Sequence, residues 1–241
     1  MDFVDILFPR KCPVCGMVLK RGERQICISC CRNLPLVKEP RCMRCGKPVS
    51  LVEETYCFDC EKKKQEGQNV LMKGTALWVY DTHMKQAMAN FKYEGCLEDG
   101  SFYVEELCKN RGDEIANWSV EAVIPVPLHW RKRWFRGYNQ AEVLAEGLGE
   151  YLQLPVLGNV LKRSRYTIPQ KGLAPKQRAQ NLTGAFAVTK KGRERVSDIH
   201  RVLLVDDIYT TGATLEACAE VLRAEGVQEI FFACLCIGRD F

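Results

Sequence analysis

Four Cys-x-x-Cys pairs lie within the first 60 residues, and they are the strongest sign of chemistry in the chain. Two residues between paired cysteines let one tight turn present both sulfurs to a metal ion, and a second such turn completes a tetrahedron. A shift of thirty residues maps the first two pairs onto the last two, so the segment is an internal duplication. The pattern predicts two structural zinc sites with the ligands Cys12, Cys15, Cys27, Cys30, Cys42, Cys45, Cys57 and Cys60.

Two pairings of these cysteines are open. In a consecutive arrangement the first four cysteines share one ion and the last four share another, whereas in a crossed arrangement the first and third pairs share one ion. We favour the consecutive arrangement because each repeat is then self-contained. Cys31 follows Cys30 and could replace it as a ligand. The alternative to zinc is a metal-free thiol cluster or a redox pair, and the all-sulfur ligand set favours closed structural sites.

A second group of chemically capable residues lies near the C-terminus. The apolar run Val202–Val205 predicts a buried strand that ends in two adjacent acids, Asp206 and Asp207. Paired acids suit the neighbouring hydroxyls of a sugar, or a magnesium ion that bridges them. The loop that follows combines backbone N–H groups, hydroxyls, a glycine and a helix start, as phosphate binding requires, in Thr210, Thr211, Gly212, Ala213 and Thr214. The pattern predicts a ribose 5-phosphate site, and the alternative is a plain turn with a capping threonine.

These residues need a scaffold, which the alternating strand and helix patterns of the chain predict. They indicate an α/β fold with a largely parallel sheet over residues 67–241, preceded by a cysteine module over residues 1–66. The charged segment Glu61–Asn69 is interpreted as the linker. Predicted strands are Ala76–Tyr80, Ala122–Val126, Val156–Leu157, Ala185–Val188, Val202–Val205 and Ile230–Leu235, and predicted helices are His83–Tyr93, Phe102–Asn110, Gln140–Tyr151 and Ala213–Ala224.

Positive charge is concentrated in one window. The whole chain carries +5, but Leu128–Arg178 holds ten basic and three acidic residues, which is +7 and indicates an anionic partner. Within it, aromatic and basic residues interleave over His129–Tyr138, a pattern that suits single-stranded nucleic acid. Phe135 and Tyr138 fit better as covers of the sheet edge. The candidate nucleic-acid residues are Trp130, Arg131, Arg133, Trp134, Arg136, Arg165 and Arg178.

Composition places the chain among ordinary globular proteins, with 241 residues, 46% of them apolar and 27% charged. The longest apolar run, Ile230–Ile237, is far shorter than a membrane-spanning helix, so no membrane insertion is expected. The first residues include acids where a signal peptide has basic residues, so a cytoplasmic location is expected. His83, His129 and His200 lack partners at ligand or triad spacing, and no serine or cysteine nucleophile is apparent.

The stretch VDDIYTTGAT resembles the phosphoribosyl pyrophosphate (PRPP) signature of type I phosphoribosyltransferases. The FPRKCPVCG, PVPLH and RGYNQA segments, together with PQ…L…QR..N..GAF, resemble the ComF/ComFC competence family, which joins a cysteine zinc module to such a domain. The resemblance implies a type I phosphoribosyltransferase-like parallel sheet with helices on both faces, after a small duplicated zinc-knuckle or ribbon domain. It also implies a pyrophosphate loop at Pro125, Val126, Pro127 and Leu128, and a mobile loop over Lys162–Arg178 that includes Arg163.

Two functions follow from the resemblance. The first, which we favour, is a part in DNA uptake and natural transformation, with a domain that binds PRPP or another phosphorylated ribose and a surface that binds single-stranded DNA. Other DNA-uptake or recombination proteins are then possible partners. The second is an active magnesium-dependent phosphoribosyltransferase for an unidentified acceptor, with Asp206 and Asp207 as catalytic residues. Trp130 and Trp134 stand where relatives more often carry Pro or Leu, which puts the detail of that surface in doubt.

Overall fold

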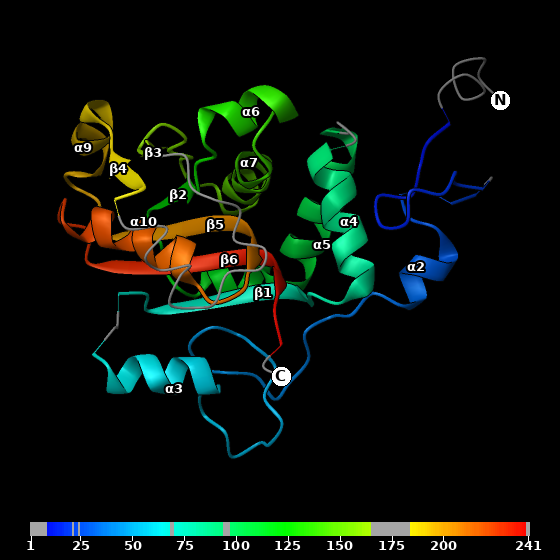
Figure 1. Cartoon of the computed structure of the whole chain (residues 1–241), viewed down its shortest axis with the longest axis horizontal. Helices are drawn as coiled ribbons and strands as arrows, with labels where there is room; N and C mark the ends of the chain where they lie inside the picture. The colour runs from blue at the N-terminus through cyan, green and yellow to red at the C-terminus, as the bar shows by residue number, and fades with distance from the viewer. Residues whose placement is uncertain are drawn as a thin grey trace.

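A four-stranded parallel sheet forms the centre of the protein (Figure 1). The computed structural model describes residues 9–20, 22–23, 25–67, 70–93, 97–164 and 184–239. The strands lie in the order β1 (Lys73–Val79), β6 (Glu229–Ile237), β5 (Arg201–Tyr209) and β2 (Ala122–Pro125). All three pairings are parallel, so the carboxyl ends of β2 and β5 lie side by side, with Pro125 opposite Val205. The predicted parallel sheet is therefore confirmed.

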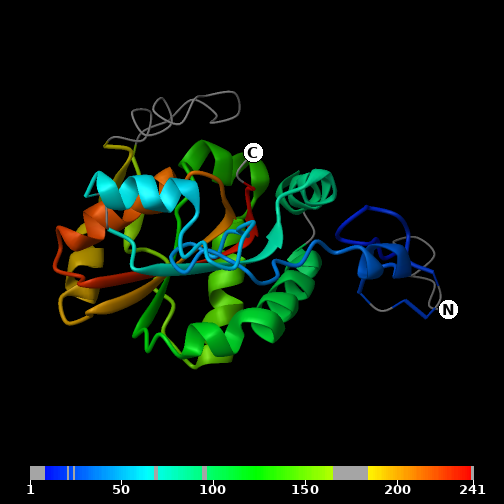
Figure 2. The same cartoon turned by 90° about the horizontal axis from the view of Figure 1, so that it is seen from below.

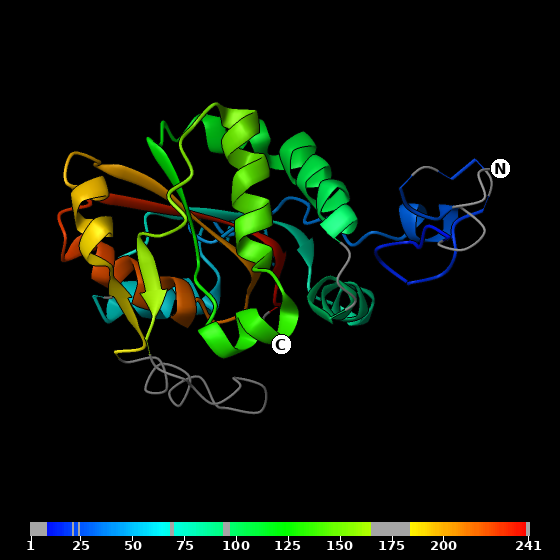
Figure 3. The ribbon, with the colours of Figure 1, turned by 90° about the horizontal axis from the view of Figure 1, so that it is seen from above.

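Both faces of the sheet are covered, because apolar side chains of each central strand point alternately to the two sides. Leu203 and Val205 pack against α4 (Thr82–Tyr93), α5 (Leu97–Ala116) and α7 (Gln140–Leu152). Val202 and Leu204 pack on the opposite side with α10 (Ala213–Arg223) and α9 (Lys190–Val196). Figures 2 and 3 show these layers in profile, with α10 on one side of the sheet and α5 and α7 on the other.

Several elements differ from the sequence predictions. Val156–Leu157 makes a single parallel bridge to β2 rather than a strand. The predicted strand near residue 186 is β4 (Phe186–Val188), which pairs antiparallel with β3 (Leu161–Arg163) outside the main sheet. Neither β3 nor the short helices α6 (Trp130–Arg136) and α9 was expected, because three to seven residues are too few to show a clear period.

Helix α5 is much longer than the predicted Phe102–Asn110, and two glycines explain the difference. Glycine disfavours helix, so Gly100 and Gly112 weaken the helical signal at both ends of α5. The fold needs them for close helix packing: a Cβ atom on Gly112 would lie 2.4 Å from the ring of Tyr151 on α7. A Cβ atom on Gly100 would lie 2.6 Å from Val143 of the same helix.

Two small cysteine units precede the sheet. Each has an antiparallel bridge beside its first cysteine pair, Lys11 with Val18 and Arg41 with Pro48. Each also has a short helix that begins after the first cysteine of its second pair: α2 (Ile28–Arg32) in the first ribbon and α3 (Phe58–Gln65) in the second. We call residues 10–32 the first ribbon and residues 37–67 the second ribbon. The predicted linker Glu61–Asn69 was wrong in its first half, because α3 continues through Gln65.

The ribbons occupy different places on the molecule (Figure 1). The first ribbon lies beside α4 and α5, where the Tyr103 hydroxyl donates to the Pro13 carbonyl at 2.9 Å. The second ribbon covers the edge strand β1: the Gly74 N–H donates to the Arg44 carbonyl at 2.7 Å, and the Val37 N–H donates to the Leu77 carbonyl at 2.9 Å. An exposed strand edge invites aggregation, so this contact protects the sheet as well as anchoring the ribbon.

Candidate functional site

The eight predicted metal ligands gather into two clusters in the structure. In each cluster the four Sγ atoms lie within 4.8 Å of one another. The first cluster is Cys12, Cys15, Cys27 and Cys30, and the second is Cys42, Cys45, Cys57 and Cys60. This is the consecutive arrangement. The Sγ atoms of Cys15 and Cys27 are 3.8 Å apart and those of Cys45 and Cys57 are 3.6 Å apart. Zinc–sulfur bonds of about 2.3 Å set the edges of a tetrahedron at roughly 3.8 Å, so both clusters fit a structural zinc ion.

The ligand shells are closed. Seven of the eight cysteines are buried, and Cys15 is half-buried. Cys31 is exposed and outside the first cluster, so it does not replace Cys30. In the second cluster neighbouring thiols lower the pKa of Cys42 and raise that of Cys45. Four sulfur ligands leave no open position for substrate, which makes both sites structural.

The acid pair lies where β5 ends. The Asp207 N–H donates to Oδ1 of Asp206 at 2.9 Å, and Lys92 from α4 forms an ion pair with Asp207. Burial, then the neighbouring Asp207, raises the pKa of Asp206. Burial opposes ionisation of Asp207 too, but the Lys92 ammonium outweighs it and lowers that pKa. Asp207 therefore holds the negative charge of the pair most firmly, and Asp206 takes up a proton first.

The predicted phosphate loop connects β5 to α10. Gly212 has φ +81°, and a Cβ atom there would lie 2.6 Å from the Tyr209 hydroxyl, so only glycine fits without strain. The Thr211 Oγ1 atom is buried and has no hydrogen-bond partner among the described residues. A buried hydroxyl in that state marks a place where a ligand oxygen can bind. A small pocket lies here, lined by Asp206, Ile208, Tyr209, Thr210, Gly212, Ala213, Thr214 and Leu215.

Among the described residues, four cations interact with the acid pair. Arg163 on β3 interacts electrostatically with Asp206 and places its guanidinium 5.2 Å from the centre of the Phe186 ring. Lys132 and Arg136 on α6 interact with Asp207, as Lys92 does. Partial burial, followed by the charges of Arg163 and Arg136, lowers the pKa of Lys132. Crowded like charges around two acids favour a polyanionic ligand, since it would relieve their repulsion.

Lys92 and Lys132 were not among the residues predicted to form this site. Lys132 was counted in the basic window, and its neighbours in the sequence drew attention to stacking rather than to the acids. Lys92 belongs to a helix far away in the chain, and a single lysine has no spacing that could identify it.

The proposed pyrophosphate loop begins beside the acids. The Val126 N–H donates to the Val205 carbonyl at 2.9 Å, which continues the β2–β5 ladder as far as the residue before Asp206. The Val126 carbonyl accepts from Nδ2 of Asn139, the N-cap residue of α7, at 3.0 Å. Pro125 and Val126 are buried, whereas Pro127 is half-buried. This loop is thus held at the same edge of the sheet as Asp206 and Asp207.

Helix α6 displays the predicted stacking residues. No residue of α6 is buried, and Trp130 and Trp134 are 65% and 84% exposed. Phe135 was expected to cover the sheet edge, but it is 76% exposed because α6 projects from the sheet. Tyr138 does pack inward: it donates to the Phe91 carbonyl and its ring lies 6.0 Å from that of Phe91.

The basic residues of the window divide into three groups. Arg131 is exposed and lies 5.2 Å from the centre of the Trp130 ring. Arg133 forms an ion pair with Glu142, and Arg136 turns inward to donate to Gln140 at 3.2 Å. Arg165 and Arg178 lie outside the described residues. His129, which had no assigned role, is the N-cap of α6, where its Nδ1 accepts from the Arg131 N–H at 3.3 Å.

Fold and site together define a phosphoribosyltransferase-type domain joined to a double zinc ribbon. Residues 3–61 match the double zinc ribbon domain family, and residues 136–240 match the phosphoribosyl transferase domain family. Among solved structures, purine phosphoribosyltransferase from Pyrococcus horikoshii is 20% identical, covering 56% of this chain and 74% of that chain with a TM-score of 0.35.

Competence proteins are among the relatives that this chain matches. Competence protein F of Haemophilus influenzae is 46% identical over 110 residues, which are 46% of this chain and 47% of the relative. DNA utilization protein YhgH of Escherichia coli O157:H7 is 32% identical over 116 residues, 48% of this chain and 49% of that protein. Competence protein ComFC of Streptococcus pneumoniae is 28% identical over 64% of each chain. The chain is thus similar to these competence and DNA utilization proteins, and it spans about half the length of the first two.

Proposed function

We propose that the sheet domain binds PRPP, or a closely related phosphorylated ribose, at the carboxyl ends of β2 and β5. The observation that carries the proposal is the buried Thr211 hydroxyl, which has no hydrogen-bond partner among the described residues and stands in the loop that follows the Asp206–Asp207 pair. The 5-phosphate would lie against the loop before α10, where backbone N–H groups and the positive end of a helix dipole stabilise negative charge. The acids then accept from the ribose hydroxyls.

The cations around the acid pair could bind the pyrophosphate end of the ligand. A pyrophosphate at C1 of the ribose needs several donors, and Lys132, Arg136 and Arg163 lie around the acid pair to provide them. Two carboxylates also fit a magnesium ion, a hard cation that binds carboxylate and phosphate oxygens together. Magnesium would neutralise the pyrophosphate, and Asp206 and Asp207 would hold it together with the ribose. Within the described residues, Lys92 now neutralises Asp207.

The competence family and the exposed face of α6 together support a DNA-handling role. Trp130 and Trp134 stand free of the core, and Arg131 keeps an exposed charge beside Trp130. Single-stranded DNA binds to such surfaces by stacking bases on the rings while cations follow the phosphates. DNA-uptake or recombination proteins are the partners that this role implies, in the cytoplasm. No helix among the described residues is long and apolar enough to cross a membrane.

One sample of protein tests ribose binding and DNA binding together. We expect isothermal titration with PRPP and magnesium chloride to give saturable heat, and titration with a labelled oligonucleotide to give a rise in anisotropy. Asp206→Asn with Asp207→Asn should abolish the PRPP heat, because the ribose and the cation lose both carboxylates. Asp198→Asn changes an exposed acid that precedes the amino end of β5, whereas the acid pair lies toward its carboxyl end, and it is the matched control. Undiminished affinity in the double variant would contradict the assignment.

Catalytic turnover is the second candidate function, favoured by the cations that could stabilise a leaving pyrophosphate. Transfer from C1 of the ribose passes through a cationic sugar, so water must be excluded and the pyrophosphate must be held. Release of pyrophosphate from PRPP, measured with a panel of bases, distinguishes an enzyme from a binding protein. Asp206→Asn with Asp207→Asn is the inactive control.

A further inference from the structure

Lys63 connects the second ribbon to the phosphate loop and to α10. Lys63, in the last turn of α3, places its Nζ 2.6 Å from Oε1 of Glu216 on α10. The same ammonium donates to the Thr211 carbonyl at 2.5 Å. Both lysine and glutamate side chains are largely buried, with 15% and 21% exposure, so solvent screens the pair only in part. Figures 1 and 2 show α3 lying beside α10 on the same side of the sheet.

We propose that Lys63 is a positioning residue for the ribose-phosphate site, so that the second zinc ribbon is a working part of that site. The inference rests on the proposed binding of a phosphorylated ribose. It assigns a functional difference between the two ribbons, because the described contacts of the first ribbon run to α4 and α5 instead.

The first physical argument concerns the peptide between Thr211 and Gly212. A trans peptide is planar, and its carbonyl and N–H point in opposite directions. Lys63 holds the Thr211 carbonyl toward α3, so the Gly212 N–H must point in the opposite direction, away from Lys63. Gly212, which has a positive φ, is the N-cap residue of α10. A fixed N–H group beside the Thr211 hydroxyl is a prearranged phosphate donor, which avoids an ordering cost on binding.

The second argument concerns charge. Glu216 lies in the first turn of α10, where a carboxylate is favourable to the helix but repels a phosphate bound at the same end. Lys63 neutralises that carboxylate. Without the lysine, Glu216 would compete with the ligand for the positive end of the helix.

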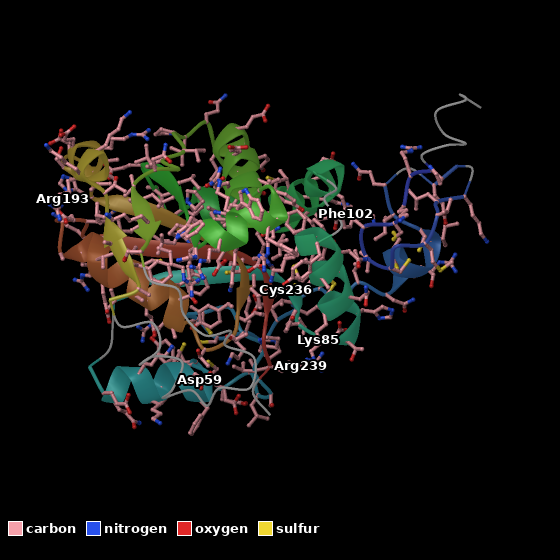
Figure 4. All side chains as sticks on the ribbon, turned by 45° about the horizontal axis from the view of Figure 1, so that its top comes forward. Asp59, Lys85, Phe102, Arg193, Cys236 and Arg239 are labelled. Atoms are coloured by element: carbon pink, nitrogen blue, oxygen red, sulfur yellow. The ribbon has the colours of Figure 1, made fainter. Side chains whose placement is uncertain are left out.

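The second metal cluster sets the position of Lys63. Cys57 is the N-cap of α3, and Cys60 lies in its first turn, so two of the four ligands hold the start of this helix. Lys63 follows Cys60 by three residues and projects from the same side of the helix. Within the same ribbon, Lys47 forms an ion pair with Asp59 of α3 at 2.7 Å. Figure 4 labels Asp59 on this helix.

The test compares Lys63→Met with Lys62→Met, which removes an exposed lysine one position away on α3. Both proteins should keep two equivalents of zinc. We expect Lys63→Met to weaken PRPP binding about tenfold in isothermal titration, and Lys62→Met to leave it unchanged. Adding Glu216→Gln to Lys63→Met should recover part of the loss, because the uncompensated carboxylate is gone. Unchanged affinity in the Lys63→Met protein would overturn the inference.

A readout without ligand separates this inference from the proposed function. In hydrogen exchange, the Glu216 amide, which donates to the Gly212 carbonyl at 2.9 Å, should exchange faster in Lys63→Met than in Lys62→Met. If the unmodified protein binds no PRPP, the proposed function fails, and the exchange result alone decides whether Lys63 holds the loop. Equal exchange in both variants would then reject Lys63 as a positioning residue.

Discussion

Lys92 on α4 forms an ion pair with Asp207 at the end of β5, and thus joins two elements that no sequence motif connects. Loss of one partner from such a pair leaves a partly buried charge uncompensated. We expect Lys92→Met to lower the free energy of unfolding by about 3 kcal/mol, the low end for buried pairs, because both side chains keep some exposure. Urea denaturation measures the change.

The control for Lys92 is Lys85→Met, an exposed lysine of the same helix labelled in Figure 4. The urea midpoint of Lys85→Met should equal that of the unmodified protein. Combining Lys92→Met with Asp207→Asn should recover part of the loss, because the remaining charge is then removed. Equal midpoints for Lys92→Met and Lys85→Met would show that the ion pair contributes no stability.

Thr211→Val should separate binding from stability. Valine has nearly the shape of threonine and removes a buried hydroxyl that has no partner among the described residues, so the free protein should be as stable or up to about 1 kcal/mol more stable. PRPP affinity should fall by roughly tenfold, because the ligand loses one hydrogen bond. Thermal unfolding and isothermal titration give the two values.

Thr189→Val is the contrasting variant. The Thr189 hydroxyl accepts from the Gly192 N–H at 2.9 Å and caps α9, so its loss should cost about 1 kcal/mol without changing PRPP affinity. If Thr211→Val destabilises the free protein as much as Thr189→Val does, the Thr211 hydroxyl has a structural role instead.

The exposed face of α6 leads to a prediction about salt dependence. Trp134→Ala should weaken single-stranded DNA binding roughly tenfold and leave the slope of log K against log salt unchanged, because stacking releases no counterions. Arg131→Ala should reduce the slope by about 0.7. Arg133→Ala should reduce it less, since Glu142 already compensates its charge. Anisotropy titrations between low and moderate salt decide; equal slopes for both arginine variants would contradict the structural distinction.

The two zinc ions should differ in what their loss does to the sheet. Metal analysis should find two equivalents in the unmodified protein and one in either Cys12→Ser or Cys42→Ser. The second cluster shares the core that includes Leu204 and Tyr209, whereas the first shares the α4 and α5 side. Cys42→Ser should therefore lower the melting temperature of the sheet domain by about 5 °C or more, and Cys12→Ser should lower it less. The reverse order would mean that the first ribbon supports the sheet.

His129 should make stability depend on pH. Burial, then Arg131, Arg163 and Lys132, lowers its pKa below the ordinary 6.5. The unfolded chain therefore binds a proton that the folded protein does not, so the stabilising contribution is complete above pH 6.5 and declines as pH falls toward the folded pKa. His129→Asn keeps an N-cap acceptor and should flatten the unfolding free energy between pH 6.5 and 5. An identical pH profile in both proteins would exclude this role.

Local spacing was enough to predict the parts of the site that are contiguous in the chain. Four evenly placed Cys-x-x-Cys pairs identified all eight cluster ligands, because a tight turn presents both sulfurs of a pair without help from the rest of the fold. Asp206, Asp207 and the loop to Gly212 were likewise predicted, since a strand end, a turn and a helix start are adjacent in the sequence. The division at residues 66 and 67 stays a prediction.

Only the tertiary structure decided which residues from distant segments contact these local units. Spacing left the consecutive and crossed zinc pairings open, because both place cysteines in equivalent turns, and the folded ribbons select the first. Lys92 and Lys63 reach the same strand end and loop from separate helices, and an isolated lysine looks like any solvated charge until packing directs it. The outward turn of α6, which exposes Phe135, similarly depends on how the helix meets the sheet. Contacts between distant segments are set by packing geometry, which residue spacing along the chain does not encode.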